Sequence, residues 1–131
     1  MIVLDTSYLI SIARGEPDLG SKIGQLDEED VFLTAIAHFE IFRSGAKMGQ
    51  KEHSFFSNLF SAYEILPFDT ESSRSASIIQ EKLDKVGLKV KIIDVLIAGT
   101  SLGHGISRIA TRDEDFKVIA KVEQLNVMDE L

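Results

Sequence analysis

Five short apolar runs, separated by longer segments with helical spacing, constrain the fold of this sequence more than any other feature. The runs consist mostly of aliphatic residues and cover residues 2–4, 31–34, 64–66, 108–111 and 125–127. Strands with one face in water would alternate apolar and polar residues, whereas strands covered by helices on both faces are apolar throughout. The runs therefore predict a parallel sheet whose strands are buried on both faces.

The segments between these runs have apolar residues at helical spacing, which predicts helices over residues 6–14, 17–26, 35–47, 50–61, 70–86, 92–104 and 113–119. Residues 6–30 fit either two short helices or one broken helix. Alternating strands and helices favour right-handed crossovers between parallel strands. The 131 residues are enough for one domain with a substantial hydrophobic interior but few for two domains. We therefore expect one three-layer α/β domain over residues 1–131.

The amino-acid composition excludes several classes of protein and of catalytic site. The chain has no Cys, which excludes disulfides, thiol catalysis and zinc sites built on cysteine. No apolar run approaches the roughly 18 residues of a membrane span. The first residues, Met1–Asp5, lack the basic region of a secretory signal, so we expect a cytoplasmic protein without membrane contact.

The net charge of −7, from 14 basic and 21 acidic residues, argues against a protein that coats nucleic acid through bulk positive charge. It does not exclude an enzyme that acts on nucleic acid. Such an enzyme can hold its substrate through bound divalent cations and a few local basic side chains, and its metal site adds negative charge.

Four carboxylates occur in surroundings where a lone charge would be costly. Asp94 lies among apolar residues at the start of a helix, and Glu40 lies in a helix that is apolar almost all round. Asp5 ends the first strand, and Asp113 closely follows the fourth. A buried ionised carboxylate costs several kcal/mol unless it is paired or bound to a cation. Each of these four residues therefore needs a partner.

The expected topology supplies a shared partner. With a strand order of 3-2-1-4-5, the first strand is central, and the four carboxylates converge on the edge where the parallel strands end. Two unit charges about 4 Å apart repel by roughly 4 kcal/mol at an effective dielectric near 20. A hard divalent cation resolves this repulsion, and an all-oxygen acidic site suits Mg²⁺ or Mn²⁺.

Four segments together resemble the PIN-domain family and, within it, the VapC-type toxins of prokaryotic toxin–antitoxin pairs. The matching segments, in the order in which the family has them, are Val3–Ser7, Thr34–Glu40, Ile93–Ala98 and Ile109–Phe116. Any one of them would be weak evidence, but together they span nearly the whole chain. The resemblance implies the PIN α/β/α sandwich with a five-stranded parallel sheet.

The resemblance also implies a function, namely metal-dependent cleavage of RNA phosphodiester bonds to leave a 5′-phosphate and a 3′-hydroxyl. The acidic quartet of the family carries over onto Asp5, Glu40, Asp94 and Asp113, with Asp115 as an alternative fourth ligand. A small antitoxin and a homodimer are the implied partners. The Phe-bearing segments at 35–61 would be a plausible dimer surface.

Arg43 and Lys47 share a helix face with Glu40, at three and seven residues beyond it. They could form a basic rim that contacts RNA phosphates, or an ordinary solvated face. Arg14 and Arg112 are further candidates for RNA contact.

Each candidate also has a purely structural interpretation. Asp5 and Asp113 could cap helices, Glu40 could pair with Arg43, and Asp94 could pair with a distant Lys or Arg. His38 and His104 are more plausibly structural or surface residues than general bases, since metal-activated water makes a base unnecessary. The aromatic residues fit a core or a subunit contact better than a platform that stacks RNA bases, and they are Phe39, Phe42, Phe55, Phe56 and Phe60.

Other functions remain open at this point. The same fold could serve a housekeeping RNA-processing nuclease without an antitoxin, or a catalytically silent interaction module. A receiver domain that accepts phosphate ranks lower. It needs an acidic pair at the first strand end and a Lys after the fifth strand, but Thr6 follows Asp5 and no Lys follows the last strand.

Overall fold

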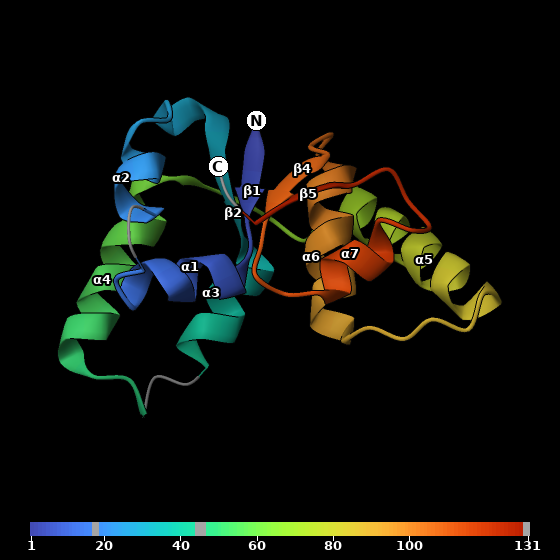
Figure 1. Cartoon of the computed structure of the whole chain (residues 1–131), viewed down its shortest axis with the longest axis horizontal. Coiled ribbons are helices and arrows are strands. Elements are labelled where there is room, and N and C mark those ends of the chain that lie inside the picture. The colour runs from blue at the N-terminus through green and yellow to red at the C-terminus, as the bar shows by residue number, and fades with distance from the viewer. Residues whose placement is uncertain (17–18, 44–46, 130–131) are drawn as a thin grey trace.

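The computed structural model describes residues 1–16, 19–43 and 47–129, which form a parallel sheet between two layers of helices (Figure 1). The strands are β1 (Ile2–Leu4), β2 (Val31–Thr34), β3 (Glu64–Leu66), β4 (Arg108–Ala110) and β5 (Asn126–Met128). They follow the order β3-β2-β1-β4-β5, and every neighbouring pair is parallel. The predicted fold and strand order are confirmed, although β4 ends one residue early and β5 begins one residue late.

The helices lie close to their predicted ranges. They are α1 (Thr6–Ala13), α2 (Leu19–Gly24), α3 (Ala35–Phe42), α4 (Gln50–Ala62), α5 (Thr70–Lys85), α6 (Ile92–Gly103) and α7 (Asp115–Ile119), with a 3₁₀ turn at Glu28–Asp30. The segment 6–30 therefore holds two short helices rather than one broken helix. The helices predicted over 17–26 and 35–47 extend over residues 17–18 and 44–46, which lie outside the described residues. In the part of the chain that the structure describes, no helix is long and apolar enough to cross a membrane.

Alternate residues of β1 belong to two different cores, one on each face of the sheet. Val3 packs in a cluster with buried residues of α5, α6 and α7. Ile2 and Leu4 belong to a second cluster, which includes residues of α1, α3 and α4. Figure 1 shows these helix groups on opposite sides of the strands. Burial on both faces explains why β1 is apolar throughout, whereas the edge strands β3 and β5 begin with the exposed residues Glu64 and Asn126.

The aromatic side chains of α3 and α4 mostly build the second core. Phe56 and Phe60 are buried, and the Phe60 ring lies 5.8 Å from that of Phe42 between centroids. His38 packs on the same group, with its ring centroid 4.5 Å from that of Phe42. Phe39 differs, since it is 57% exposed. Phe56 and Phe60 therefore belong to the core, whereas a subunit contact, the other predicted role, stays a prediction for Phe39.

Two glycines allow α5 and α6 to approach each other closely. A Cβ atom at Gly99 would lie 2.6 Å from the Cβ of Ala76 and 2.7 Å from its backbone nitrogen. One at Gly103 would lie 2.8 Å from the carbonyl oxygen of Glu71 and from the amide nitrogen of Ser72. This contact fixes α6 against α5, and the first turn of α6 carries Asp94.

Candidate metal centre

Asp5 follows the central strand β1 and is almost fully buried, with 2% of its surface exposed. Its Oδ2 atom accepts hydrogen bonds from the hydroxyls of Ser7 and Thr111, both at 2.7 Å, and from the Ser7 amide at 3.3 Å. The capping interpretation is therefore correct, since Asp5 is the N-cap of α1. It leaves the other oxygen free: Oδ1 is buried without a hydrogen-bond partner.

The residues around Asp5 also join the ends of β1 and β4. The amide of Asp113 donates to the Thr111 hydroxyl at 3.0 Å, and the amide of Arg112 donates to the Ser7 hydroxyl at 2.9 Å. Burial raises the pKa of Asp5, although the bonds from Ser7 and Thr111 oppose that rise. Thr111 was not among the predicted site residues. Its position directly after an apolar strand and two residues before Asp113 was the available signal.

Asp94 lies in the first turn of α6 and is 4% exposed. Burial raises its pKa to about 8, and a hydrogen bond with Asp115 and the nearby carboxylates of Asp5 and Asp113 add to the rise. Lys91 opposes it, with its Nζ atom 3.6 Å from Oδ2 of Asp94. That oxygen is buried without a hydrogen-bond partner. An ion pair of Asp94, the structural alternative to metal binding, therefore exists, but with a lysine only three residues away.

Asp113 and Asp115 complete a compact acidic group with Asp94. One carboxylate oxygen of each lies within 4.8 Å of the others. We call these three residues the acidic cluster. The Asp115 amide donates to Oδ1 of Asp113 at 2.9 Å, so Asp113 caps the start of α7 in part. Burial raises the pKa of Asp113, but the Lys91 hydrogen bond and the Asp115 amide outweigh burial and lower the pKa below its usual value.

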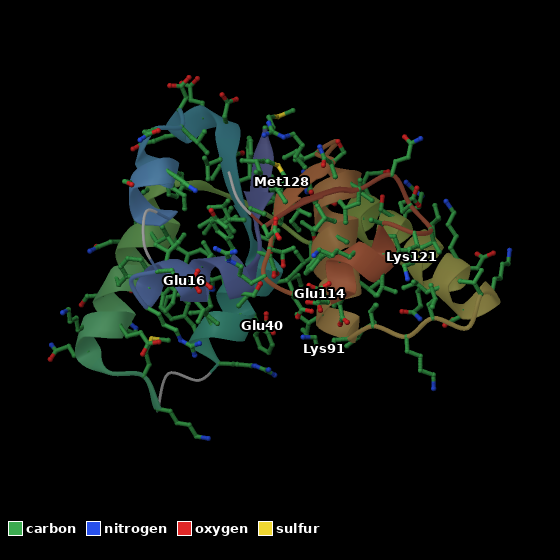
Figure 2. All side chains as sticks on the ribbon, viewed as in Figure 1. Glu16, Glu40, Lys91, Glu114, Lys121 and Met128 are labelled. Atoms are coloured by element: carbon green, nitrogen blue, oxygen red, sulfur yellow. The ribbon has the colours of Figure 1, made fainter. Side chains whose placement is uncertain are left out.

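Glu40 lies apart from the acidic cluster. It is half-buried on α3 and lines a hollow of about 200 Å³ together with Arg14, Lys47 and Glu52. Figure 2 shows Glu40 and Lys91 at the same lower edge of the molecule, beyond the carboxyl ends of the strands. The acidic cluster thus contains Asp94, Asp113 and Asp115, with Asp5 close enough to raise the pKa of Asp94. Glu40 reaches the same edge from the opposite helix layer.

The candidate basic residues divide into two groups. Arg14 and Lys47 line the hollow beside Glu40, and Arg43 is exposed at the end of α3. Arg112 instead pairs with Glu16, 3.0 Å between Nη2 and Oε2, and its guanidinium lies 5.6 Å from the ring centroid of Tyr8. Arg112 is therefore held against α1 rather than left free.

His104 is engaged away from the acidic cluster. Its Nε2 atom lies 3.0 Å from the carbonyl oxygen of Pro67 and 3.4 Å from a carboxylate oxygen of Asp69. These contacts link the end of α6 to the segment after β3. They support the structural interpretation of this histidine.

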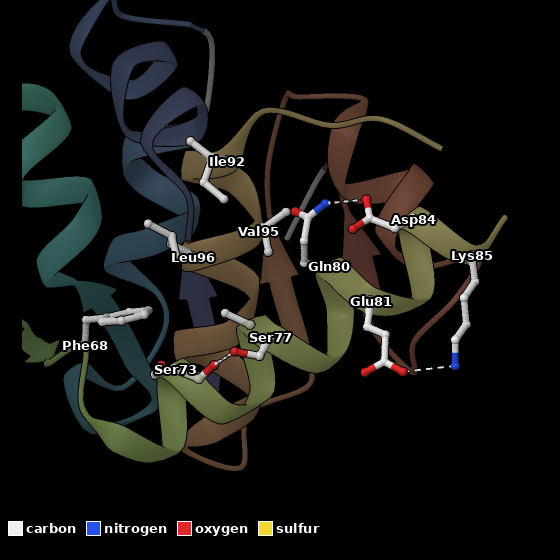
Figure 3. A pocket seen from close by; sticks show the side chains of 11 residues that line it. Phe68, Ser73, Ser77, Gln80, Glu81, Asp84, Lys85, Ile92, Val95 and Leu96 are labelled. Atoms are coloured by element: carbon white, nitrogen blue, oxygen red, sulfur yellow. Dashed lines mark hydrogen bonds and ion pairs between the residues drawn. The ribbon is translucent and has the colours of Figure 1, made fainter. Parts of the chain in front are cut away.

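A separate groove of about 700 Å³ lies between α5 and α6 (Figure 3). Its lining includes the apolar side chains of Phe68, Ile92 and Leu96. The charged groups on its α5 side are paired along the helix, Glu81 with Lys85 at 2.9 Å and Asp84 with Gln80 at 2.9 Å. None of the described side chains that line this groove has a buried polar atom without a hydrogen-bond partner.

The donor set at the end of β1 and β4 fits a hard divalent cation. Two buried carboxylate oxygens, Oδ1 of Asp5 and Oδ2 of Asp94, have no hydrogen-bond partner. Buried polar atoms without a partner are rare and call for an explanation, and a bound ion is one. Carboxylates gathered this closely also repel one another, which a cation would offset.

Comparison with known proteins agrees with this geometry. The sequence model of the PIN domain matches residues 2–122. The chain belongs to the PIN domain family. Among curated relatives of this PIN domain, VapC ribonuclease Y4jK of Sinorhizobium fredii is 32% identical over 124 residues, covering 86% of this chain and 87% of the relative. Ribonuclease VapC1 of Rickettsia felis is 29% identical over 128 residues, covering 96% of each.

Solved structures show the same fold. FitAcB from Neisseria gonorrhoeae superposes with a TM-score of 0.80 at 27% identity, covering 98% of this chain and 96% of the other. VapBC2 from Rickettsia felis, solved bound to a DNA fragment from its promoter, gives a TM-score of 0.82 at 20% identity and 97% coverage of each chain. At 20% identity the second match supports the fold alone. The resemblance inferred from the four sequence segments is thus confirmed.

Proposed function

We propose that this PIN domain is an endoribonuclease that uses a divalent metal ion to hydrolyse RNA, and that it is the toxin of a toxin–antitoxin pair. The observation that carries the proposal is the acidic cluster beside Asp5, where Oδ1 of Asp5 and Oδ2 of Asp94 are buried without a hydrogen-bond partner. The curated relatives are ribonucleases by name, and their alignment spans most of both chains. Similar solved structures include the DNA-bound VapBC2 complex.

Asp94, Asp113 and Asp115 would hold the metal ion, together with the free oxygen of Asp5. Their oxygen ligands suit Mg²⁺ or Mn²⁺ better than softer metals. A bound ion of this kind supplies an activated water and offsets negative charge on the phosphate. Glu40 approaches the same strand edge from α3, and we assign it to the outer part of the metal site.

The side chains around the ligands have separate tasks. Ser7 and Thr111 hold Oδ2 of Asp5, so that its Oδ1 atom is oriented away from these donors. Arg14 and Lys47 line the hollow next to Glu40, where they can bind phosphates of the RNA strand on either side of the cleaved bond. Phosphate contacts of this kind position a nucleic acid without reading its sequence. Arg43, exposed at the end of α3, extends this basic surface.

Two partners belong to the proposal. A small antitoxin would restrain the nuclease, and a second copy of the chain would form a homodimer. A nearby gene for a short DNA-binding protein would support the antitoxin. Its absence, with nuclease activity retained, would instead favour a housekeeping RNA-processing enzyme.

The decisive experiment is cleavage of a structured RNA by the purified protein with Mn²⁺, with Mg²⁺ and with a chelator. We expect cleavage only with metal, and none from the Asp5→Ala variant at equal protein concentration. End-labelling should show a 5′-phosphate and a 3′-hydroxyl at the new ends. Cleavage that survives both the chelator and Asp5→Ala would refute the proposed function.

A further inference from the structure

We infer that Lys91 is a built-in counter-ion of the acidic cluster, which a divalent cation must displace in order to bind. The inference rests on the proposed function, because it takes the acidic cluster as the metal site. The proposed function names residues that promote metal binding. This inference adds one that opposes it.

The position of the Lys91 ammonium carries the inference. Its Nζ atom donates a hydrogen bond to Oδ2 of Asp113 and lies 3.6 Å from Oδ2 of Asp94. These oxygens belong to two of the three carboxylates that gather within 4.8 Å. A cation that bridges Asp94 and Asp113 would use the carboxylates that now face the ammonium. Lysine and metal therefore exclude each other at this position.

The backbone of Lys91 takes part in the site independently of its side chain. The Lys91 amide donates to Oδ2 of Asp115 at 2.9 Å, which ties the start of α6 to the first residue of α7. A substitution at position 91 keeps this bond, because any residue except proline retains the amide. The charge can thus be removed while the backbone that carries the ligands stays in place.

The Lys91 side chain can leave the cluster without disturbing the core. It is 66% exposed, whereas Asp94 beside it is buried. Lysine has a flexible four-carbon stem that allows its ammonium to move into solvent. Displacement by a metal ion therefore requires no change in packing. It requires only that the ion bind the carboxylates more favourably than the ammonium does.

Removing the charge should therefore strengthen metal binding. In the unmodified protein the ammonium must give up its contacts with Asp113 and Asp94 when the ion binds, and losing one attraction between unit charges a few ångströms apart in water corresponds to about tenfold in the dissociation constant. We expect Lys91→Met to bind Mn²⁺ about tenfold more tightly than the unmodified protein. Lys91→Arg keeps the charge and should bind like the unmodified protein.

Calorimetric titration of the full chain with MnCl₂ measures this effect without any nuclease assay. A mildly alkaline buffer limits competition by protons for the carboxylates. Lys89→Met is the matched control, because it removes the same charge from an exposed residue two positions earlier. Circular dichroism verifies that each variant is folded, and Lys91→Gln replaces Lys91→Met if the latter does not fold.

The outcomes separate this inference from the proposed function. Tighter Mn²⁺ binding by Lys91→Met supports the role of Lys91 as a counter-ion, provided that Lys91→Arg and Lys89→Met bind Mn²⁺ like the unmodified protein. Binding by Lys91→Met that equals or falls below that of the unmodified protein overturns it and leaves the metal site standing. No Mn²⁺ binding by any of the proteins overturns the counter-ion and the metal site together.

Discussion

The hydroxyl of Thr111 donates a hydrogen bond to Oδ2 of Asp5 at 2.7 Å, across 106 positions of sequence. It connects the residue after β1 with the residue after β4, the two neighbouring strands whose ends carry the candidate ligands. The orientation of Asp5 therefore depends on a side chain that is not itself a candidate ligand.

Thr111→Val should lower both stability and activity, because it removes this donor while keeping the shape of the side chain. We expect the free energy of unfolding to fall by about 1–2 kcal/mol, as for other buried hydrogen bonds that lose one partner. Urea titration measures the change. Thr111→Ser retains the hydroxyl and should recover most of the activity, and a Val variant as active as the unmodified protein would contradict the role of Thr111.

Asp94→Asn should abolish RNA cleavage yet stabilise the metal-free protein. The pKa of Asp94 is 3.8 in an unfolded chain and about 8 in the folded protein. Between these values the folded state binds more protons than the unfolded state, so the ionisable Asp94 makes stability fall as pH rises. The variant removes this loss. Its advantage in unfolding free energy should be small near pH 4 and should grow towards pH 8.

Urea titration of both proteins at several pH values, with a chelator present, measures the advantage of Asp94→Asn. A large destabilisation at every pH would show instead that Asp94 mainly forms a structural ion pair with Lys91. Excess Mn²⁺ gives a second comparison, since ligand at one hundred times its dissociation constant stabilises a protein by about 2.7 kcal/mol. This gain should appear in the unmodified protein and disappear in the variant.

Glu40→Gln tests whether the helix opposite the acidic cluster contributes to metal binding. We expect weaker Mn²⁺ binding and at least about tenfold slower cleavage, with unfolding free energy changed by less than about 0.5 kcal/mol, since Glu40 is only half-buried. Glu52→Gln is the control, because Glu52 lines the same hollow from α4. Equal effects of the two substitutions would assign Glu40 to the surface charge of the hollow rather than to the metal.

Gly99→Ala should destabilise the protein through the contact between α5 and α6. The added Cβ would lie 2.6 Å from the Cβ of Ala76 and 2.7 Å from its backbone nitrogen, so the helices would have to move apart. Overpacking of this kind costs about 1–3 kcal/mol. Gly24→Ala, where nothing lies within 4 Å of the new Cβ, is the comparison and should be neutral or stabilising. Thermal unfolding of both variants measures the difference.

The sequence predicted β1 and β2 well because burial on both faces leaves little freedom in the composition of these strands. Val31–Thr34 is apolar apart from its last residue, and it occupies the predicted place beside β1. The ends of elements were less predictable. The helix expected over 35–47 is α3, which ends at Phe42, and Leu125 precedes β5 although it belongs to the predicted run. Leu125 is as apolar as the strand that it precedes, so apolar spacing alone does not mark the start of β5.

The residues of the site differed in how well the sequence predicted them. Asp94 could be predicted because it is one carboxylate in an apolar run, and the structure buries it. Lys91 could not be predicted, because an exposed lysine before a helix is common and its contact with Asp113 depends on a segment 22 positions later. The question of Asp113 or Asp115 also could not be answered from spacing, and the structure gathers both with Asp94.

The pairing of β1 with β4 has a consequence for the cell that makes this protein. Asp5 leaves the ribosome early, whereas Thr111, Asp113 and Asp115 emerge only after more than a hundred further residues have been joined. A nascent chain that is still short of these residues lacks two members of the acidic cluster. If these residues hold the metal, the unfinished chain has no complete metal site while its message is still being read.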